Sequence, residues 1–209
     1  MFSLTPITTG LVAITCIISF LGFSNRRIID SLIFWPPAIS EKRQYYRFIS
    51  CGFVHANLIH LAFNMITLYS FGSIMESHFF RVLDLPEYVF LLMYIGALIV
   101  SVIPSYIKQK NNYNYRSLGA SGAVCAVLFA FVLMRPWQPI LVLFIPAPSI
   151  VYAALFLIYT AYMSKKGGDH INHDAHFWGA LFGIAFMIVV RPTLMQDFLN
   201  QLSHPHFNI

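Results

Sequence analysis

A serine and a histidine, far apart in the chain and each set in apolar sequence, have the side chains that nucleophilic catalysis requires. Ser121 stands in the segment GASG (119–122), and His176 stands in the segment AHFWG (175–179). A serine hydroxyl is a weak nucleophile that needs an adjacent base, and histidine most often serves as that base. The pair therefore predicts acyl transfer by nucleophilic catalysis, provided that the fold brings the two side chains together.

A second polar group can stabilise the negative charge that such a reaction creates. His60 and Asn64 are four residues apart, so they share one face of a helix. Polar groups in a membrane helix are costly and usually face the interior of the bundle. We expect both side chains, with backbone N–H groups at Gly119 and Ser121, to bind the oxyanion of a tetrahedral intermediate. His55 is expected to be structural and to bond to loop backbone.

Other interpretations of the same residues remain. Asp174 lies two residues before His176, which allows a Ser–His–Asp triad, but an Asp at this place is more often a helix N-cap. His170, His173 and His176 are spaced by three and could bind a metal, but no acidic set accompanies them. We therefore expect a Ser–His dyad, with neither a metal nor a cofactor.

The composition shows what kind of fold must hold these residues. The chain has 209 residues, of which 58% are hydrophobic and 10% charged, and its mean hydropathy is +0.68. Soluble domains carry about 25% charged residues, and disordered chains are less apolar. The chain is therefore expected to be a polytopic protein of the lipid bilayer. Its net charge of +5 is spread over several loops and forms no nucleic-acid patch. Three cysteines in apolar stretches argue against a disulfide framework.

Six apolar segments are expected to cross the membrane as helices. The first lacks the basic start and the cleavage site of a signal peptide, so we expect it to be retained. We predict an all-α membrane protein with a single domain over residues 1–209, a core at about 45–190 and a polar tail at 193–209. The six segments are about Pro6–Phe23, Arg47–Glu76, Glu87–Ile107, Ser121–Met134, a part of Ile140–Met163, and Ala175–Val190.

The fourth segment is too short to cross a bilayer alone. Its fourteen residues rise about 21 Å as a helix, whereas the hydrocarbon core is about 30 Å thick. Its first residue, Ser121, must then lie below the membrane surface, at the floor of a cavity inside the bundle. Gly179 and Gly183 form a GxxxG on the sixth segment, which allows close approach to the fourth.

Taken together, the motifs around Ser121, His176 and the pair His60 and Asn64 resemble those of the rhomboid family of intramembrane serine proteases. GASG matches the family's GxSG motif, residues 175–183 match AHxxGxxxG, and residues 55–64 match HxxxxHxxxN. The likeness covers about Tyr45–Val190. It implies a six-helix fold in which Ser121 and His176 form the dyad, and cleavage of membrane proteins in or near their transmembrane helices. Tyr46-Arg47 resembles the family's Trp-Arg pair, and Gly72 and Glu76 resemble its glycine and glutamate closing the second helix.

Two other function classes were weighed against a protease. A rhomboid-like protein without proteolytic activity would bind membrane helices for quality control. A transporter would use the intramembrane histidines, but the spans contain no paired acidic residues and show no repeat.

One position departs from the family pattern. Rhomboids often carry an aromatic residue one turn after the serine, stacked on the base, whereas this chain has Cys125 there. We therefore expect His176 either to be less firmly oriented or to be held by Phe177, Trp178 or another aromatic ring. The fifth segment, with prolines near its start, is expected to be a lateral gate for the substrate.

Two features of the chain favour opposite orientations in the membrane. The resemblance implies cytoplasmic ends and a site that opens outward, in a location that we take to be a bacterial inner membrane. The positive-inside rule favours the reverse orientation. We favour the family orientation, which leaves three basic residues inside (Arg81, Arg135, Arg191) and ten outside (Arg26, Arg27, Lys42, Arg43, Arg47, Lys108, Lys110, Arg116, Lys165, Lys166).

Overall fold

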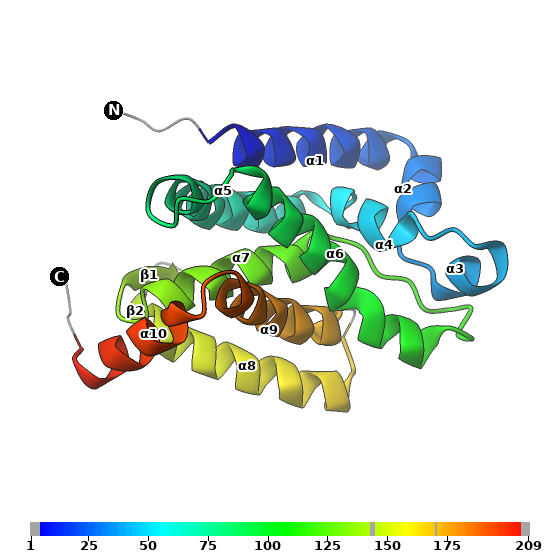
Figure 1. The fold of residues 1–209 in the computed structure, drawn as a ribbon. Coiled ribbons are helices and arrows are strands. Elements are labelled where there is room, and N and C mark those ends of the chain that lie inside the picture. Colours follow the sequence, from blue (N-terminus) through cyan, green and yellow to red (C-terminus); the bar gives the residue numbers. More distant parts are fainter. Residues whose placement is uncertain (1–4, 143–144, 170, 206–209) are drawn as a thin grey trace.

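The computed structural model describes residues 5–142, 145–169 and 171–205, which are predominantly helical, as the sequence predicts. Four short elements join the first long helix to the second. The order is α1 (Pro6–Ser24), α2 (Arg26–Leu32), α3 (Pro36–Lys42), α4 (Arg47–Ser50), the 3₁₀ turn η1 (Cys51–Phe53), α5 (Leu58–Arg81), α6 (Tyr88–Gln109), α7 (Ser121–Met134), β1 (Pro139–Val142), β2 (Ile145–Pro148), α8 (Ser149–Lys166), α9 (His173–Val190) and α10 (Thr193–Ser203). In Figure 1, α2 to α4 lie at one end of the molecule, and the hairpin and α10 lie at the other.

Within the described residues, four helices are long and apolar enough to cross a membrane. They are α1, the part of α5 from Leu58 to Phe79, α6 and α9. The helix α7 is apolar but shorter, with 14 residues, and its bounds are those predicted from the sequence.

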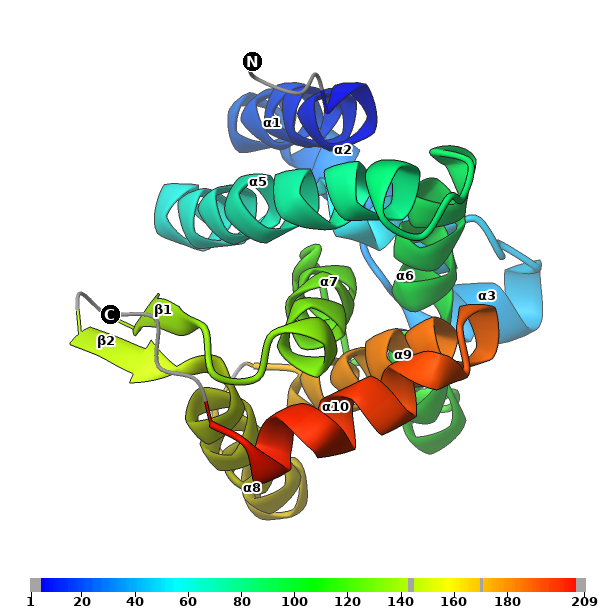
Figure 2. The same cartoon turned by 60° about the vertical axis from the view of Figure 1, so that its left-hand side comes forward.

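The short helix α7 is the centre of the fold. It lies among α5, α6 and α9, as Figure 2 shows, and all its residues from Gly122 to Leu133 are buried. Its most extensive contact is with α9. A Cβ atom added at Gly179 would lie 2.8 Å from the carbonyl carbon of Gly122, and one at Gly183 would lie 2.7 Å from that of Ala126. The two backbones therefore touch, and only glycine fits at these two positions.

The second predicted span begins later than expected. The structure starts α5 at Leu58, and the segment from Arg47 to Phe53 instead forms α4 and η1. The side chain of Asn57 accepts a hydrogen bond from the backbone N–H of His60 at 2.8 Å. This N-cap satisfies a donor that the first turn leaves without a partner, and so defines the start of α5.

Two further segments form elements that the sequence did not predict. The prolines near the start of the fifth segment lie in an antiparallel hairpin, where β1 pairs with β2, and α8 begins only at Ser149. These prolines therefore precede α8 and do not weaken its hydrogen bonding. Within the expected polar tail, Thr193–Ser203 forms the helix α10, with Leu194 buried. Residues 206–209 of that tail lie outside the described residues.

A buried arginine holds the connection between α1 and α5 together. The side chain of Arg47 is only 5% exposed. Its guanidinium donates to the carbonyl oxygens of Ile33, at 2.6 Å, and Asp30, at 3.1 Å, and to the side chain of Gln44 at 2.7 Å. Charge-assisted bonds of this kind are stronger than neutral ones. Arg47 thereby ties α4 to the end of α2 and to the loop before α3.

A buried glutamate joins α5 to the beginning of α1. Glu76 accepts hydrogen bonds from the backbone N–H groups of Ile7, at 2.9 Å, and Thr8, at 2.7 Å. These N–H groups belong to the first turn of α1, where helix geometry leaves donors free and the helix dipole favours a negative charge. Gly72, one turn earlier in α5, lets Thr8 approach, since a Cβ there would lie 3.0 Å from the Thr8 methyl carbon.

Candidate active site

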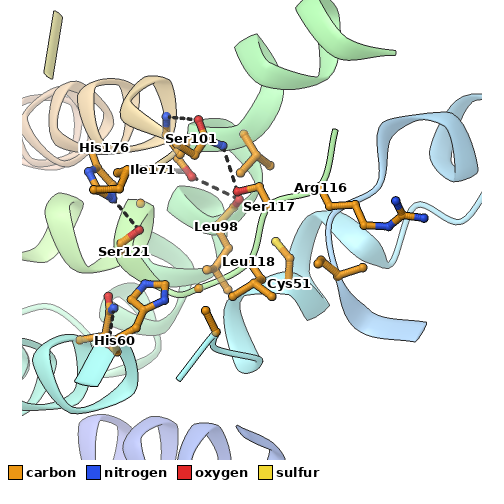
Figure 3. Close-up of a pocket in the computed structure, with 18 of the residues that line it drawn as sticks. Cys51, His60, Leu98, Ser101, Arg116, Ser117, Leu118, Ser121, Ile171 and His176 are labelled. Atoms are coloured by element: carbon orange, nitrogen blue, oxygen red, sulfur yellow. Dashed lines mark hydrogen bonds between the residues drawn. The ribbon is translucent and has the colours of Figure 1, made fainter. Parts of the chain in front are cut away.

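The structure places the serine and the histidine in direct contact. Ser121 is the first residue of α7, and His176 lies in the first turn of α9. The distance between His176 Nε2 and Ser121 Oγ is 2.7 Å, which is a hydrogen bond of ordinary length. Figure 3 shows the two side chains pointing toward one another. The close packing of α7 on α9 is what brings together residues 55 positions apart.

His60 and Asn64 line the same cavity as this pair. The cavity has a volume of about 460 Å³ and is bordered by Ser121, His176, His60 and Asn64 together. The Asn64 amide nitrogen donates to the carbonyl oxygen of His60 at 2.9 Å, which leaves its second hydrogen for another acceptor. The first N–H groups of α7, beginning with that of Ser121, have no intrahelical acceptor.

Gly119 turns the chain into α7 at a place where no other residue fits. Its φ of +116° lies in the region that favours glycine. A Cβ atom there would also lie 2.7 Å from the His60 ring carbon Cε1. The position of Ser121 and the position of the His60 ring therefore both depend on this glycine.

His55 supports the backbone next to the nucleophile. The backbone N–H of Ala120 donates to His55 Nε2 at 3.3 Å, so this ring nitrogen is unprotonated. The proton is then on Nδ1, which lies 3.0 Å from the Ser19 hydroxyl oxygen, and that hydroxyl donates to the carbonyl of Phe53. The ring is fully buried, and this burial lowers the pKa of His55 to about 3. His55 is therefore neutral and structural, and it bonds to loop backbone.

Backbone hydrogen bonds from the connection between α1 and α5 hold the segment that precedes Ser121. Phe34 and Ser117 exchange backbone hydrogen bonds of 2.9 and 3.1 Å. The N–H of Gly119 donates to the carbonyl of Cys51 at 2.9 Å, so this N–H, expected to bind the oxyanion, already has an acceptor. Sequence reasoning did not find this contact, because the pairing of two irregular segments leaves no periodic pattern.

Asn172 is a site residue that the sequence reasoning missed. Its side-chain oxygen accepts from the backbone N–H of Ala175 at 3.1 Å and from the Ser105 hydroxyl at 2.9 Å. Its nitrogen donates to the Ser117 hydroxyl at 3.3 Å. Asn172 thus caps α9 and ties it both to α6 and to the segment before the nucleophile. An Asn at the beginning of an apolar helix is the signal that could have found it.

Asp174 bonds to residues other than the base. Its carboxylate accepts from Lys108 Nζ at 2.9 and 2.8 Å and from the Ser164 hydroxyl. The interpretation of Asp174 as the N-cap of α9 is wrong, because Asn172 occupies that position. The triad arrangement is not formed either, since the carboxylate is held by α6 and α8 and no bond joins Asp174 to His176 in the described structure.

His173, one of the three histidines weighed as metal ligands, contacts a carboxylate and the ring of His176. His173 Nε2 lies 3.0 Å from a carboxylate oxygen of Asp169. The ring of His173 meets that of His176 edge to face, with 6.0 Å between the centroids. His170 lies outside the described residues.

The ring stacked on His176 comes from an unexpected helix. Phe177 and Trp178 contact each other edge to face, at 5.7 Å. It is Phe156, on α8, that stacks on His176, with centroids 6.1 Å apart and an interplanar angle of 29°. On α7, Cys125 offers no ring at the corresponding turn.

Comparisons with known proteins agree with this geometry. The family model of the Rhomboid domain matches residues 42–193. The mitochondrial presenilin-associated rhomboid-like proteins of Bos taurus and Homo sapiens are each 34% identical over 140 residues, which is 65% of this chain and 35% of theirs. A Bacillus subtilis protein, YdcA, whose name assigns it provisionally to the rhomboid proteases, is 24% identical over 196 residues, covering 90% of this chain and 91% of its own. The chain thus spans about a third of the length of the mitochondrial relatives.

Proposed function

The chain belongs to the rhomboid family, and we propose that it is an intramembrane serine endopeptidase. It would hydrolyse a peptide bond in or near the transmembrane helices of membrane-protein substrates. The observation that carries the proposal is the 2.7 Å contact between His176 Nε2 and Ser121 Oγ, within a cavity that His60 and Asn64 also line. Nucleophile, base and candidate oxyanion donors thus meet in one place.

The reaction follows from the positions of these groups. Ser121 Oγ attacks the scissile carbonyl carbon while its proton passes to His176 Nε2. The carbonyl oxygen becomes an oxyanion, which the N–H of Ser121 and the side chains of Asn64 and His60 stabilise. His176 then returns the proton to the leaving amine, and an acyl-enzyme remains. A water molecule gives a proton to His176 and attacks the ester carbonyl carbon. As this second tetrahedral intermediate collapses, the carboxylic acid product leaves and His176 returns the proton to Ser121 Oγ.

The architecture that we propose for this reaction has six membrane helices. To the four helices with sufficient length and apolarity, it adds the short central α7 and the outer α8. Because α7 begins at Ser121, the nucleophile would lie at membrane depth and be reached by water through the cavity above it.

The apolar helices and the family make the chain an integral membrane protein. Its location in a bacterial inner membrane stays a prediction, since the relatives' names include mitochondrial proteins as well as one from Bacillus subtilis. We retain the outward-facing orientation as a proposal. The burial of Arg47 supports it, because one of the ten outward basic residues is then bound inside the fold.

A serine-directed fluorophosphonate probe tests the proposal. We expect the purified protein to be labelled, and the labelling to be lost in Ser121→Ala without a change in melting temperature. Ser31→Ala is a matched control, since the hydroxyl of this exposed serine donates to the carbonyl of Ile28, and its backbone carbonyl, which accepts from the Tyr46 hydroxyl, is unchanged by the substitution. The same preparations are tested for cleavage of transmembrane-helix substrates. A folded wild type that is neither labelled nor cleaves any substrate would favour the non-proteolytic rhomboid-like alternative.

A further inference from the structure

We propose that Phe156 is a positioning residue that holds the His176 ring in the orientation that accepts the Ser121 proton. Because Phe156 belongs to α8, the alignment of the base then depends on where α8 lies. This inference rests on the proposed function, and it adds a residue and a form of control that the sequence motifs do not contain.

The first observation is the geometry of the rings. The Phe156 and His176 rings are stacked, at 6.1 Å and 29°, which is within the range of offset stacking. Phe156 is held in turn by Phe129 of α7, at 5.7 Å, and by Tyr152 of α8, at 5.5 Å. Aromatic rings of α7 and α8 are therefore in continuous contact with the imidazole of His176 on α9.

The second observation is what α7 offers to the same imidazole. One turn after Ser121, α7 carries Cys125, which is buried at 8% exposure. A thiol has no flat face to stack on a ring. The outer helix therefore supplies the stacking contact that the central helix does not.

The third observation is how differently α7 and α8 are packed. From Gly122 to Leu133, α7 is buried throughout. In the described part of α8, the buried residues are small, namely Ser149, Ala153 and Thr160. The helix α8 packs mainly on α9, with lesser contacts to α7 and the hairpin. Its larger core contacts, Ile150, Tyr152, Phe156 and Leu157, are only partly buried, so α8 is held less deeply in the fold than α7.

The two ends of α8 are held unequally. At its beginning, Ser149 Oγ donates to the carbonyls of Arg135, at 2.7 Å, and Pro136, at 2.9 Å. At its end, the chain passes through Gly167 and Gly168, whose φ angles are +61° and +102° and whose surroundings leave open space for a Cβ. Among the described residues, the hydrogen bond from Ser164 to Asp174 and the edge-to-face contact between the rings of Tyr159 and His173, at 5.5 Å, tie this end to α9.

These observations together define a pivot. If α8 swings outward about Ser149, Phe156 moves away from His176, since it lies about two helical turns from the pivot. The imidazole then loses the stacking contact on one of its faces and samples orientations in which Nε2 does not face Ser121. Catalysis would thus be coupled to the return of α8 after a substrate has passed it.

The main variant is Phe156→Leu, which removes the ring but keeps apolar bulk. We expect kcat to fall by about 3- to 10-fold, as the loss of one ring pair would predict, with little change in KM. Fluorophosphonate labelling should slow by the same factor, because this small probe reaches Ser121 from water and does not need α8 to move. Phe156→Tyr should restore both rates, since it restores the ring, and Phe156→Met should repeat the loss.

The control is Leu155→Ala, at the neighbouring position of α8, where the side chain is 64% exposed. It should leave kcat and the labelling rate unchanged. The proposal is overturned if folded Phe156→Leu is labelled as fast as the wild type, whether or not kcat falls, because the ring would then act on the substrate or not at all. An equal loss in Leu155→Ala would also overturn it. Absence of labelling in the wild type would be a failure of the proposed function, and not of this step.

Discussion

The contact between α7 and α9 makes Gly183→Ala a demanding test of the architecture. The new Cβ would lie 2.7 Å from both the carbonyl carbon and Cα of Ala126, and closer still to the carbonyl oxygen, whereas ordinary van der Waals contact begins at 3.4 Å. These atoms are backbone and cannot rotate away, so the helices must separate by about 1 Å. Overpacking of this kind costs about 1–3 kcal/mol, against the gain of up to about 1 kcal/mol that Ala normally brings to a helix.

The separation should move Ser121 away from His176, because Ser121 lies on α7 and His176 lies on α9. His176 lies about two turns from Gly183 on α9, and Ser121 begins α7. A misplacement of about 1 Å can cost about 10²-fold in rate. We therefore expect kcat of Gly183→Ala to fall by about that factor and its melting temperature to drop. Gly183→Leu should be worse on both counts.

The assay compares substrate cleavage and thermal unfolding in the same detergent. Gly10→Ala is the matched control, because a Cβ at Gly10 in α1 meets nothing within 4 Å. This control should keep its activity and melt at the same or a slightly higher temperature. If Gly183→Ala behaves like Gly10→Ala, α7 and α9 do not pack through this face, and the active site described here is wrong.

Three further predictions concern single side chains. Asp174→Asn should retain most of kcat, because this carboxylate bonds to Lys108 and not to the base; a fall of about 10⁴-fold, the cost of losing a triad aspartate, would contradict the dyad. Asn64→Ala should lower kcat by about 10²- to 10³-fold, the usual cost of one oxyanion donor, with Ser121 still labelled by fluorophosphonate; full turnover would exclude Asn64 from that role. His55→Gln should reduce the loss of stability at acid pH. The pKa of His55 is about 3 in the fold and about 6.5 in the unfolded chain, so protons favour the unfolded state as pH falls from about 6.5 toward 3. Melting temperatures at pH 7 and pH 5 check this, and an equal drop in both proteins would refute it.

Local spacing was enough to indicate much of the site. The short apolar run after Ser121 predicted a helix with the bounds that α7 has. The GxxxG of Gly179 and Gly183 predicted the face of α9 that meets α7. These inferences worked because helical periodicity relates residues three or four positions apart, which is information that a single sequence contains.

The boundaries of other elements were harder to predict, for reasons that individual residues show. The start of α5 depends on Asn57 as a cap, yet the apolar sequence continues on both sides of it. The hairpin before α8 is apolar throughout, so its composition does not distinguish it from a membrane helix. Hydropathy reports burial or lipid contact, and it does not report backbone conformation.

By itself, the sequence determined which residue types could act together, that they belong to helices, and that α7 begins at Ser121. Only the tertiary structure decided what surrounds them. It showed Phe156 on the face of His176, Asn172 as the cap of α9, and Asp174 bound to Lys108 and Ser164. The physical reason is that these contacts join segments distant in sequence, whose meeting depends on how whole helices pack, and no local pattern records that packing.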